Sequence, residues 1–178
     1  MTRSDGLSQW MATVSTHMPH LSPPVSTVLA LWSFGRVMTK SCGLTTVAGF
    51  LSDLLKQPEN TVRQRLREWY YAAEDKRGEQ RRELAVRESF GPLLRWVLSY
   101  WPSAEKRLAL AMDATTLAQV FTVLVISVIY RGCAIPIAWI ILPATAQGAW
   151  QPHWRALFAG LQDSIAADWT VIVLADRG

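Results

Sequence analysis

Residues 108–115 read Leu-Ala-Leu-Ala-Met-Asp-Ala-Thr, and residues 171–178 read Val-Ile-Val-Leu-Ala-Asp-Arg-Gly. In each stretch an apolar run, typical of a buried strand, ends in an aspartate, Asp113 or Asp176. A carboxylate at the end of a buried strand is costly unless it is paired, hydrogen-bonded or bound to a metal ion. Neighbouring strands lie about 4.8 Å apart, so adjacent parallel strands would bring both carboxylates to one cation. Their hard oxygen ligands would favour Mg²⁺ or Mn²⁺.

The residues between these two stretches predict further strands and one helix. Residues 107–114 alternate as a strand does, and residues 120–130 and 133–142 are rich in Val, Ile and aromatic side chains on either side of an Arg131-Gly132 turn. Apolar residues then recur at helical spacing over residues 154–165, before a short β-branched run at 170–174. We therefore predict the order β-β-β-α-β, with the first and fourth strands as neighbours.

Two alternatives compete with this interpretation. Asp113 could cap a turn before Thr115, and Asp176 could begin a loop, each with only a local hydrogen-bonding role. Residues 117–142 could also form a membrane hairpin, because Arg131 is their only charged residue. A spanning helix needs about 20 apolar residues, however, and neither arm of this segment is that long. The sequence therefore favours a sheet without membrane insertion.

The first half of the chain predicts an all-α region over residues 25–106, preceded by a flexible lead-in at residues 1–24. Residues 44–71 hold two helical stripes, with Thr45 or Thr46 as the first cap and Asn60 as the second. Arg63 and Arg67, four residues apart, share an outer face of the second helix. This arrangement predicts a helix-turn-helix that binds DNA through these arginines. A plain helical hairpin with a solvated arginine face is the alternative.

Charge and cysteine usage narrow the class of protein. Residues 1–107 carry 15 basic and 10 acidic groups, whereas residues 108–178 carry three and four, which indicates a polyanion-binding module joined to a different domain. The mixed charges of residues 74–88 predict an exposed helix. Cys42 and Cys133 lack a metal-ligand spacing and are interpreted as reduced, buried thiols. No signal-peptide pattern begins the chain, so we expect a cytoplasmic protein.

Taken together, the two aspartate motifs and the basic helical region resemble the DDE transposases of cut-and-paste bacterial insertion sequences, over about residues 25–178. The resemblance implies an RNase H-like catalytic domain at residues 107–178, with Asp113 on its first strand and Asp176 after its fourth. It also implies DNA cleavage and strand transfer with two Mg²⁺ or Mn²⁺ ions, which Asp113 would bridge while Asp176 holds one. Arg177 would contact a DNA phosphate or form an outward salt bridge.

The family also needs a third carboxylate, a Glu on a later helix, and this chain ends at Gly178. Glu105 precedes the first strand and is no substitute. We therefore expect an N-terminal part of a transposase, with an incomplete catalytic domain that is inactive alone. The expected partners are double-stranded DNA at the element ends and target, together with a second copy in a homodimer associated with the nucleoid. A non-catalytic, helical DNA-binding regulator is the alternative.

Overall fold

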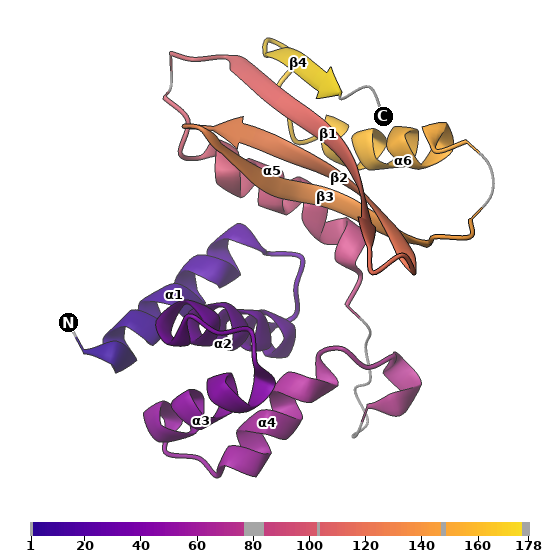
Figure 1. Cartoon of the computed structure of the whole chain (residues 1–178). Helices are drawn as coiled ribbons and strands as arrows, with labels where there is room; N and C mark the ends of the chain where they lie inside the picture. The colour runs from indigo at the N-terminus through magenta and orange to yellow at the C-terminus, as the bar shows by residue number, and fades with distance from the viewer. Residues whose placement is uncertain (1, 77–83, 103, 147–148, 176–178) are drawn as a thin grey trace. The chain divides into compact units, whose positions relative to one another are not determined.

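The computed structural model describes residues 2–76, 84–102, 104–146 and 149–175. The chain is an α+β protein that divides into two compact units, Met1–Ala85 and Val86–Gly178 (Figure 1). The described part of the first unit is helical, and the second unit holds a four-stranded mixed sheet with helices. The predicted α+β class is therefore confirmed.

The first unit is built from four α-helices around one apolar core. They are α1 (Arg3–His17), α2 (Pro23–Thr39), α3 (Leu44–Leu55) and α4 (Glu59–Glu68), followed by a short 3-10 turn, Ala73–Asp75. The centre of the core is formed by Leu7, Leu31, Trp32, Val47, Ala48, Leu51, Val62 and Leu66. Trp32 also ties α2 to α4, because its indole N–H donates a hydrogen bond to the Leu66 carbonyl at 3.0 Å. A buried indole needs such a partner.

The prediction of a flexible lead-in at residues 1–24 is wrong, because α1 begins at Arg3. A capping box starts this helix: the Asp5 amide donates to Thr2 Oγ1 at 3.1 Å, and the Thr2 amide donates to Asp5 Oδ2 at 2.8 Å. The hydrogen bonds from the Thr2 backbone and side chain lower the pKa of Asp5. Leu7 and Val14, two turns apart, are buried. Such a sparse stripe among Ser, Thr and Gly is a weak helical signal, and the cap is the stronger one.

The predicted helical pair at residues 44–71 is confirmed as α3 and α4, but its caps are not those expected. Gly43 and Pro58 occupy the N-cap positions, so Thr45, Thr46 and Asn60 lie inside the first helical turns. Between the helices, Lys56 takes the left-handed conformation (φ 55°) that commonly ends a helix. Proline, which cannot continue α3, then starts α4 with a φ already suited to it.

Gly35 marks a close approach of α2 to α3. A Cβ atom there would lie 2.6 Å from Cγ1 of the fully buried Val47. We expect Gly35→Ala to lower the free energy of unfolding by about 1–3 kcal/mol, because the helices must shift or Val47 must leave its rotamer. A urea titration in which NMR monitors the amide signals of α2 and α3 measures the change.

Gly160→Ala is the matched control for this substitution. Gly160 is also helical, and a Cβ there would meet nothing within 4 Å. Helix propensity alone should make that variant more stable by up to about 1 kcal/mol. Similar shifts in the two variants would contradict close packing at Gly35.

The second unit begins with a 3-10 turn, Val86–Ser89, and α5 (Phe90–Leu98), then follows the order β-β-β-α-β that the sequence predicts. The strands are β1 (Arg107–Leu117), β2 (Phe121–Tyr130), β3 (Cys133–Pro143) and β4 (Thr170–Ala175), and α6 (Gln151–Gln162) lies between β3 and β4. The sheet order is β3-β2-β1-β4. β1 pairs antiparallel with β2 and parallel with β4, so the predicted adjacency of the first and fourth strands is confirmed.

Local chemistry explains the irregular points of this sheet. Arg131 and Gly132 both have positive φ (50° and 81°), which suits the predicted tight turn between β2 and β3. Pro136 lies on the edge strand β3, where the register with β2 shifts between Ile126 and Ser127. Proline cannot donate to a sheet ladder, and a bulge on an edge strand tolerates it.

Helices α5 and α6 supply the core beneath the sheet (Figure 1). Phe90 and Leu94 of α5 and Leu157 and Leu161 of α6 belong to one buried cluster, together with Leu108, Leu110, Leu124, Ile126, Val128, Ile137 and Ala138 of the strands. Phe90 also packs on Trp139, with ring centroids 5.0 Å apart. Helix α5 therefore belongs to the sheet unit, and the predicted domain boundary at residues 106–107 is too late.

The predicted exposed helix over residues 74–88 is also wrong for its described part, which contains only 3-10 turns. Residues 77–83 of that segment lie outside the described residues. Mixed charges suit a solvated loop as well as an exposed helix. Without an apolar stripe, no contact with a core stabilises the segment as a helix.

β4 is an edge strand whose apolar side chains are exposed. Val171, Ile172, Val173 and Leu174 are 39–52% exposed, against 1% for Leu110 of the neighbouring β1. A buried fourth strand was expected from the apolar, β-branched run at residues 170–174. Among the described residues, the buried cluster that joins α5 and α6 to β1, β2 and β3 includes no residue of β4.

Two smaller expectations concern the cysteines and the membrane. Cys42 and Cys133 are free thiols, as predicted, but both are exposed rather than buried. They lie just before α3 and just after the turn that leads into β3, where the chain runs along the surface. Within the described ranges, none of the helices has the length and apolar character needed to span a bilayer.

Candidate functional site

The pairing of β1 with β4 positions Asp113. Six residue pairs join the two strands in parallel, from Arg107 with Thr170 to Met112 with Ala175. Asp113 is the next residue after Met112 on β1, just as Asp176 is the next after Ala175. Asp176 and Arg177 lie outside the described residues. The last described pair of the register therefore immediately precedes the two predicted catalytic aspartates.

Contacts at the opposite end of the strand pair hold this register. Lys106 Nζ donates a hydrogen bond to Asp168 Oδ2, and the Thr170 amide donates to the Lys106 carbonyl at 2.8 Å. The hydrogen bond from Lys106 lowers the pKa of Asp168. Both side chains are more than half exposed, so this ion pair contributes little stability. The backbone ladder is therefore the main constraint on the strand ends.

The sequence suggested that Asp113 ends the first strand, but Asp113 lies within β1. β1 continues to Leu117, and Asp113 and Thr115 pair with Val125 and Val123 of β2. The alternative in which Asp113 caps a turn before Thr115 is therefore wrong, because the backbone there is extended and hydrogen-bonded in a sheet. β-Branched Thr115 and Thr116 favour this continuation.

The Asp113 carboxylate is open to solvent. Leu108 and Leu110 are buried beneath the sheet, and side chains alternate along a strand, so Asp113 lies on the opposite face from them. Its exposure leaves it accessible to a cation. Across the described ranges no group of three or more His, Cys, Asp or Glu side chains forms a ready metal site.

The second predicted site lies on α4. Asn60, Arg63, Gln64 and Arg67 recur at the spacing of one helical face, and with Leu44 and Thr45 of α3 they line a surface depression. Arg63 Nη2 donates to Asn60 Oδ1 at 2.8 Å. The Arg67 guanidinium lies 5.7 Å from the centre of the Tyr71 ring. Both arginines are thereby oriented while they remain exposed.

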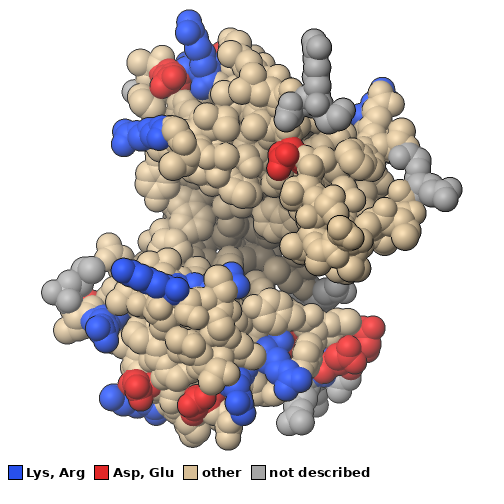
Figure 2. Space-filling model, viewed as in Figure 1, with Lys and Arg blue, Asp and Glu red and all other residues tan. Residues whose placement is uncertain are grey.

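The charge of this face is not cancelled locally. In the described part of the chain, neither Arg63 nor Arg67 forms a salt bridge, and the Asn60 amide that Arg63 contacts is neutral. Of the two acidic residues of α4, Glu59 lies four residues before Arg63 and Glu68 directly follows Arg67; Glu68 accepts a hydrogen bond from Gln64 at 2.8 Å. Figure 2 shows several basic side chains with acidic ones among them over the helical unit, and fewer charged side chains of both signs on the visible face of the sheet unit.

Sequence reasoning missed two members of this face. Asn60 was interpreted only as a cap, and Gln64 was not considered, although their spacing from Arg63 and Arg67 was available in the sequence. Amide side chains beside arginines are typical of helices that read base edges.

Comparisons with family models, with curated proteins and with solved structures found no match to this chain.

Proposed function

We propose that this chain is the N-terminal part of a DDE-type transposase, a metal-dependent enzyme of DNA transposition and recombination. The observation that carries the proposal is the parallel β1–β4 register, whose last described pair is Met112 with Ala175. One more residue of the same register would set Asp113 and Asp176 side by side at the ordinary strand spacing of about 4.8 Å. The sheet order β3-β2-β1-β4 and the element order β-β-β-α-β suit the opening of an RNase H-like domain.

Asp113 and Asp176 would hold Mg²⁺ or Mn²⁺ through their carboxylate oxygens, the hard ligands that these ions prefer. Bound there, the metal would activate an attacking oxygen and stabilise the leaving one. The exposed face of β1 leaves Asp113 room for both the ion and a DNA phosphate. Arg177, next to Asp176, would add a positive charge for that phosphate.

The helical unit would recognise duplex DNA at the element ends through α4. Arg63 and Arg67 would contact phosphates, and Asn60 and Gln64 on the same face would lie within reach of base edges. Cleaving two ends in one reaction would call for two copies of the protein on DNA, which would place it in the nucleoid.

Removal of the arginines tests the DNA-binding half of the proposal. We expect Arg63→Ala and Arg67→Ala each to weaken duplex binding and to reduce the slope of log affinity against log salt concentration by about 0.9, the value for one lost phosphate contact. Fluorescence anisotropy over a series of NaCl concentrations measures both quantities.

Arg36→Ala is the control for this experiment, because Arg36 is an exposed arginine on α2 that does not line the depression. The control should leave the salt slope unchanged. If all three variants bind like the parent chain, α3 and α4 are a packing hairpin with solvated arginines. If DNA binding depends on the two arginines but metal-dependent cleavage does not appear even in a longer chain that adds the third carboxylate, the chain is instead a non-catalytic DNA-binding regulator.

A further inference from the structure

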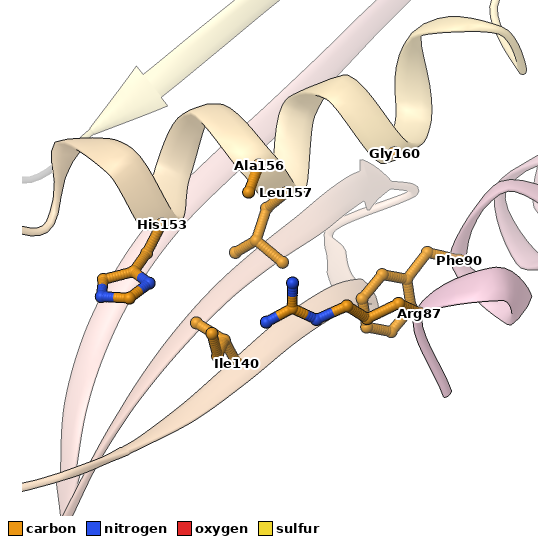
Figure 3. A pocket seen from close by; sticks show the side chains of 7 residues that line it. All are labelled: Arg87, Phe90, Ile140, His153, Ala156, Leu157 and Gly160. Atoms are coloured by element: carbon orange, nitrogen blue, oxygen red, sulfur yellow. The ribbon is translucent and has the colours of Figure 1, made fainter. Parts of the chain in front are cut away.

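A small cavity of about 40 Å³ lies in the sheet unit between α6, β3 and the turn that precedes α5 (Figure 3). Its walls are formed by Arg87, Phe90, Ile140, His153, Ala156, Leu157 and Gly160. The four residues from α6 share one helical face, and the two smallest of them, Ala156 and Gly160, keep the space open. The lining includes neither Asp113 nor any residue of α4.

Two nitrogen-bearing side chains meet this cavity across apolar walls. Figure 3 shows the Arg87 guanidinium directed toward Ile140 and Leu157, with the His153 ring on the far side of the same gap. The lining contains no Asp or Glu. Among the described residues, neither Arg87 nor His153 is paired with an acidic group. The cavity therefore presents hydrogen-bond donors and a positive charge against hydrocarbon.

These features match an oxyanion. The planar guanidinium donates two parallel N–H groups, and imidazole adds an N–H from another direction. The buried Phe90 and Leu157 lower the local dielectric constant on one side of the cavity and so strengthen such charge-assisted hydrogen bonds, whereas Arg87, Ala156 and Gly160 are open to solvent. At about 10–15 Å³ for each water-sized group, the space of about 40 Å³ takes about three of the four oxygens of a phosphate and leaves the fourth outside it. Donors on opposite walls suit a tetrahedral phosphate better than a planar carboxylate, whose two oxygens point the same way.

We propose that Arg87 and His153 bind a phosphate group in this cavity. The group belongs either to a DNA backbone or to a free phosphate, because both offer the same oxygens. Only the DNA source rests on the proposed function. In that case the sheet unit holds the DNA backbone independently of the α4 arginines.

The test is a titration of the 178-residue chain with inorganic phosphate at constant ionic strength, followed by NMR at the His153 ring and the Gly160 amide. Saturable shifts that chloride does not produce are expected. Arg87→Gln and His153→Gln should each weaken phosphate binding at least about tenfold, because each removes a hydrogen bond to a charged group. Arg155→Gln, which removes an exposed arginine of α6 outside the lining, should leave the affinity unchanged.

Duplex DNA added to the phosphate-loaded protein identifies the source of the group. If the Gly160 signal moves to a new, DNA-bound position as inorganic phosphate is displaced, the cavity binds the DNA backbone. If phosphate stays bound, the cavity binds free phosphate. Shifts that do not saturate, or an equal loss of affinity in Arg87→Gln and Arg155→Gln, overturn the proposal. A failure of DNA binding in the helical unit leaves the inorganic phosphate result intact, so the two proposals fail separately.

Discussion

Asp113→Asn is expected to abolish Mg²⁺- or Mn²⁺-dependent DNA nicking in a longer chain that adds the family's third carboxylate. The substitution keeps the size of the side chain and removes the charge that would hold the metal. Because metal ions contribute several kcal/mol to such reactions, the rate should fall at least about 10³-fold. The 178 residues alone are expected to leave DNA uncut with either side chain. Nicking of a supercoiled plasmid carrying the element's ends measures both results.

Asp163→Asn is the matched control, because Asp163 is an exposed aspartate of the same unit at the end of α6. Asp163→Asn removes the same charge at a position far from β1 in the sequence, so it should leave nicking unaffected. If the 178-residue chain nicks DNA and Asp113→Asn abolishes that nicking, two carboxylates suffice. Nicking that persists in Asp113→Asn in the longer chain would refute the role of Asp113.

Leu110→Ala is expected to lower the free energy of unfolding of the sheet unit by about 2–5 kcal/mol. Leu110 is 1% exposed and belongs to the cluster that joins the strands to α5 and α6, so the smaller side chain leaves a cavity in the core of this unit. Tryptophans lie in both units, so total fluorescence does not isolate this transition. The amide signals of β2 during a urea titration follow the sheet unit alone.

Leu117→Ala on the same strand is the control, because Leu117 is 56% exposed. Its effect should stay within about 0.5 kcal/mol. A loss for Leu110→Ala no larger than that of the control would contradict the burial of this face of β1.

Local patterns predicted the element order of the second unit because each pattern carries its own physical signal. The β-branched runs on either side of Arg131-Gly132 became β2 and β3, and the turn between them takes the positive φ values that such turns need. The apolar stripe near residues 154–165 became α6. The domain boundary was missed because α5 is amphipathic, and an apolar face does not reveal whether helices or a sheet will cover it.

The candidate site was predicted only in part, because the sequence reveals the spacing of residues along one helix but not contacts between distant segments. Arg63 and Arg67 lie on the exposed face that the helical spacing indicated, whereas Arg87 and His153, far apart in sequence, line one cavity because α6 packs against β3.

By itself, the sequence determined the helical pair α3–α4 and the order of strands and helix from β1 to β4, because these patterns depend on neighbours along the chain. Only the tertiary structure decided that α1 is ordered, that α5 packs beneath the sheet, and that Asp113 lies inside a paired strand. The sequence predicted that the first and fourth strands are neighbours, and the structure gives their parallel register residue by residue down to Met112 and Ala175. Pairing and burial are contacts between distant segments, and their energies depend on which surfaces meet.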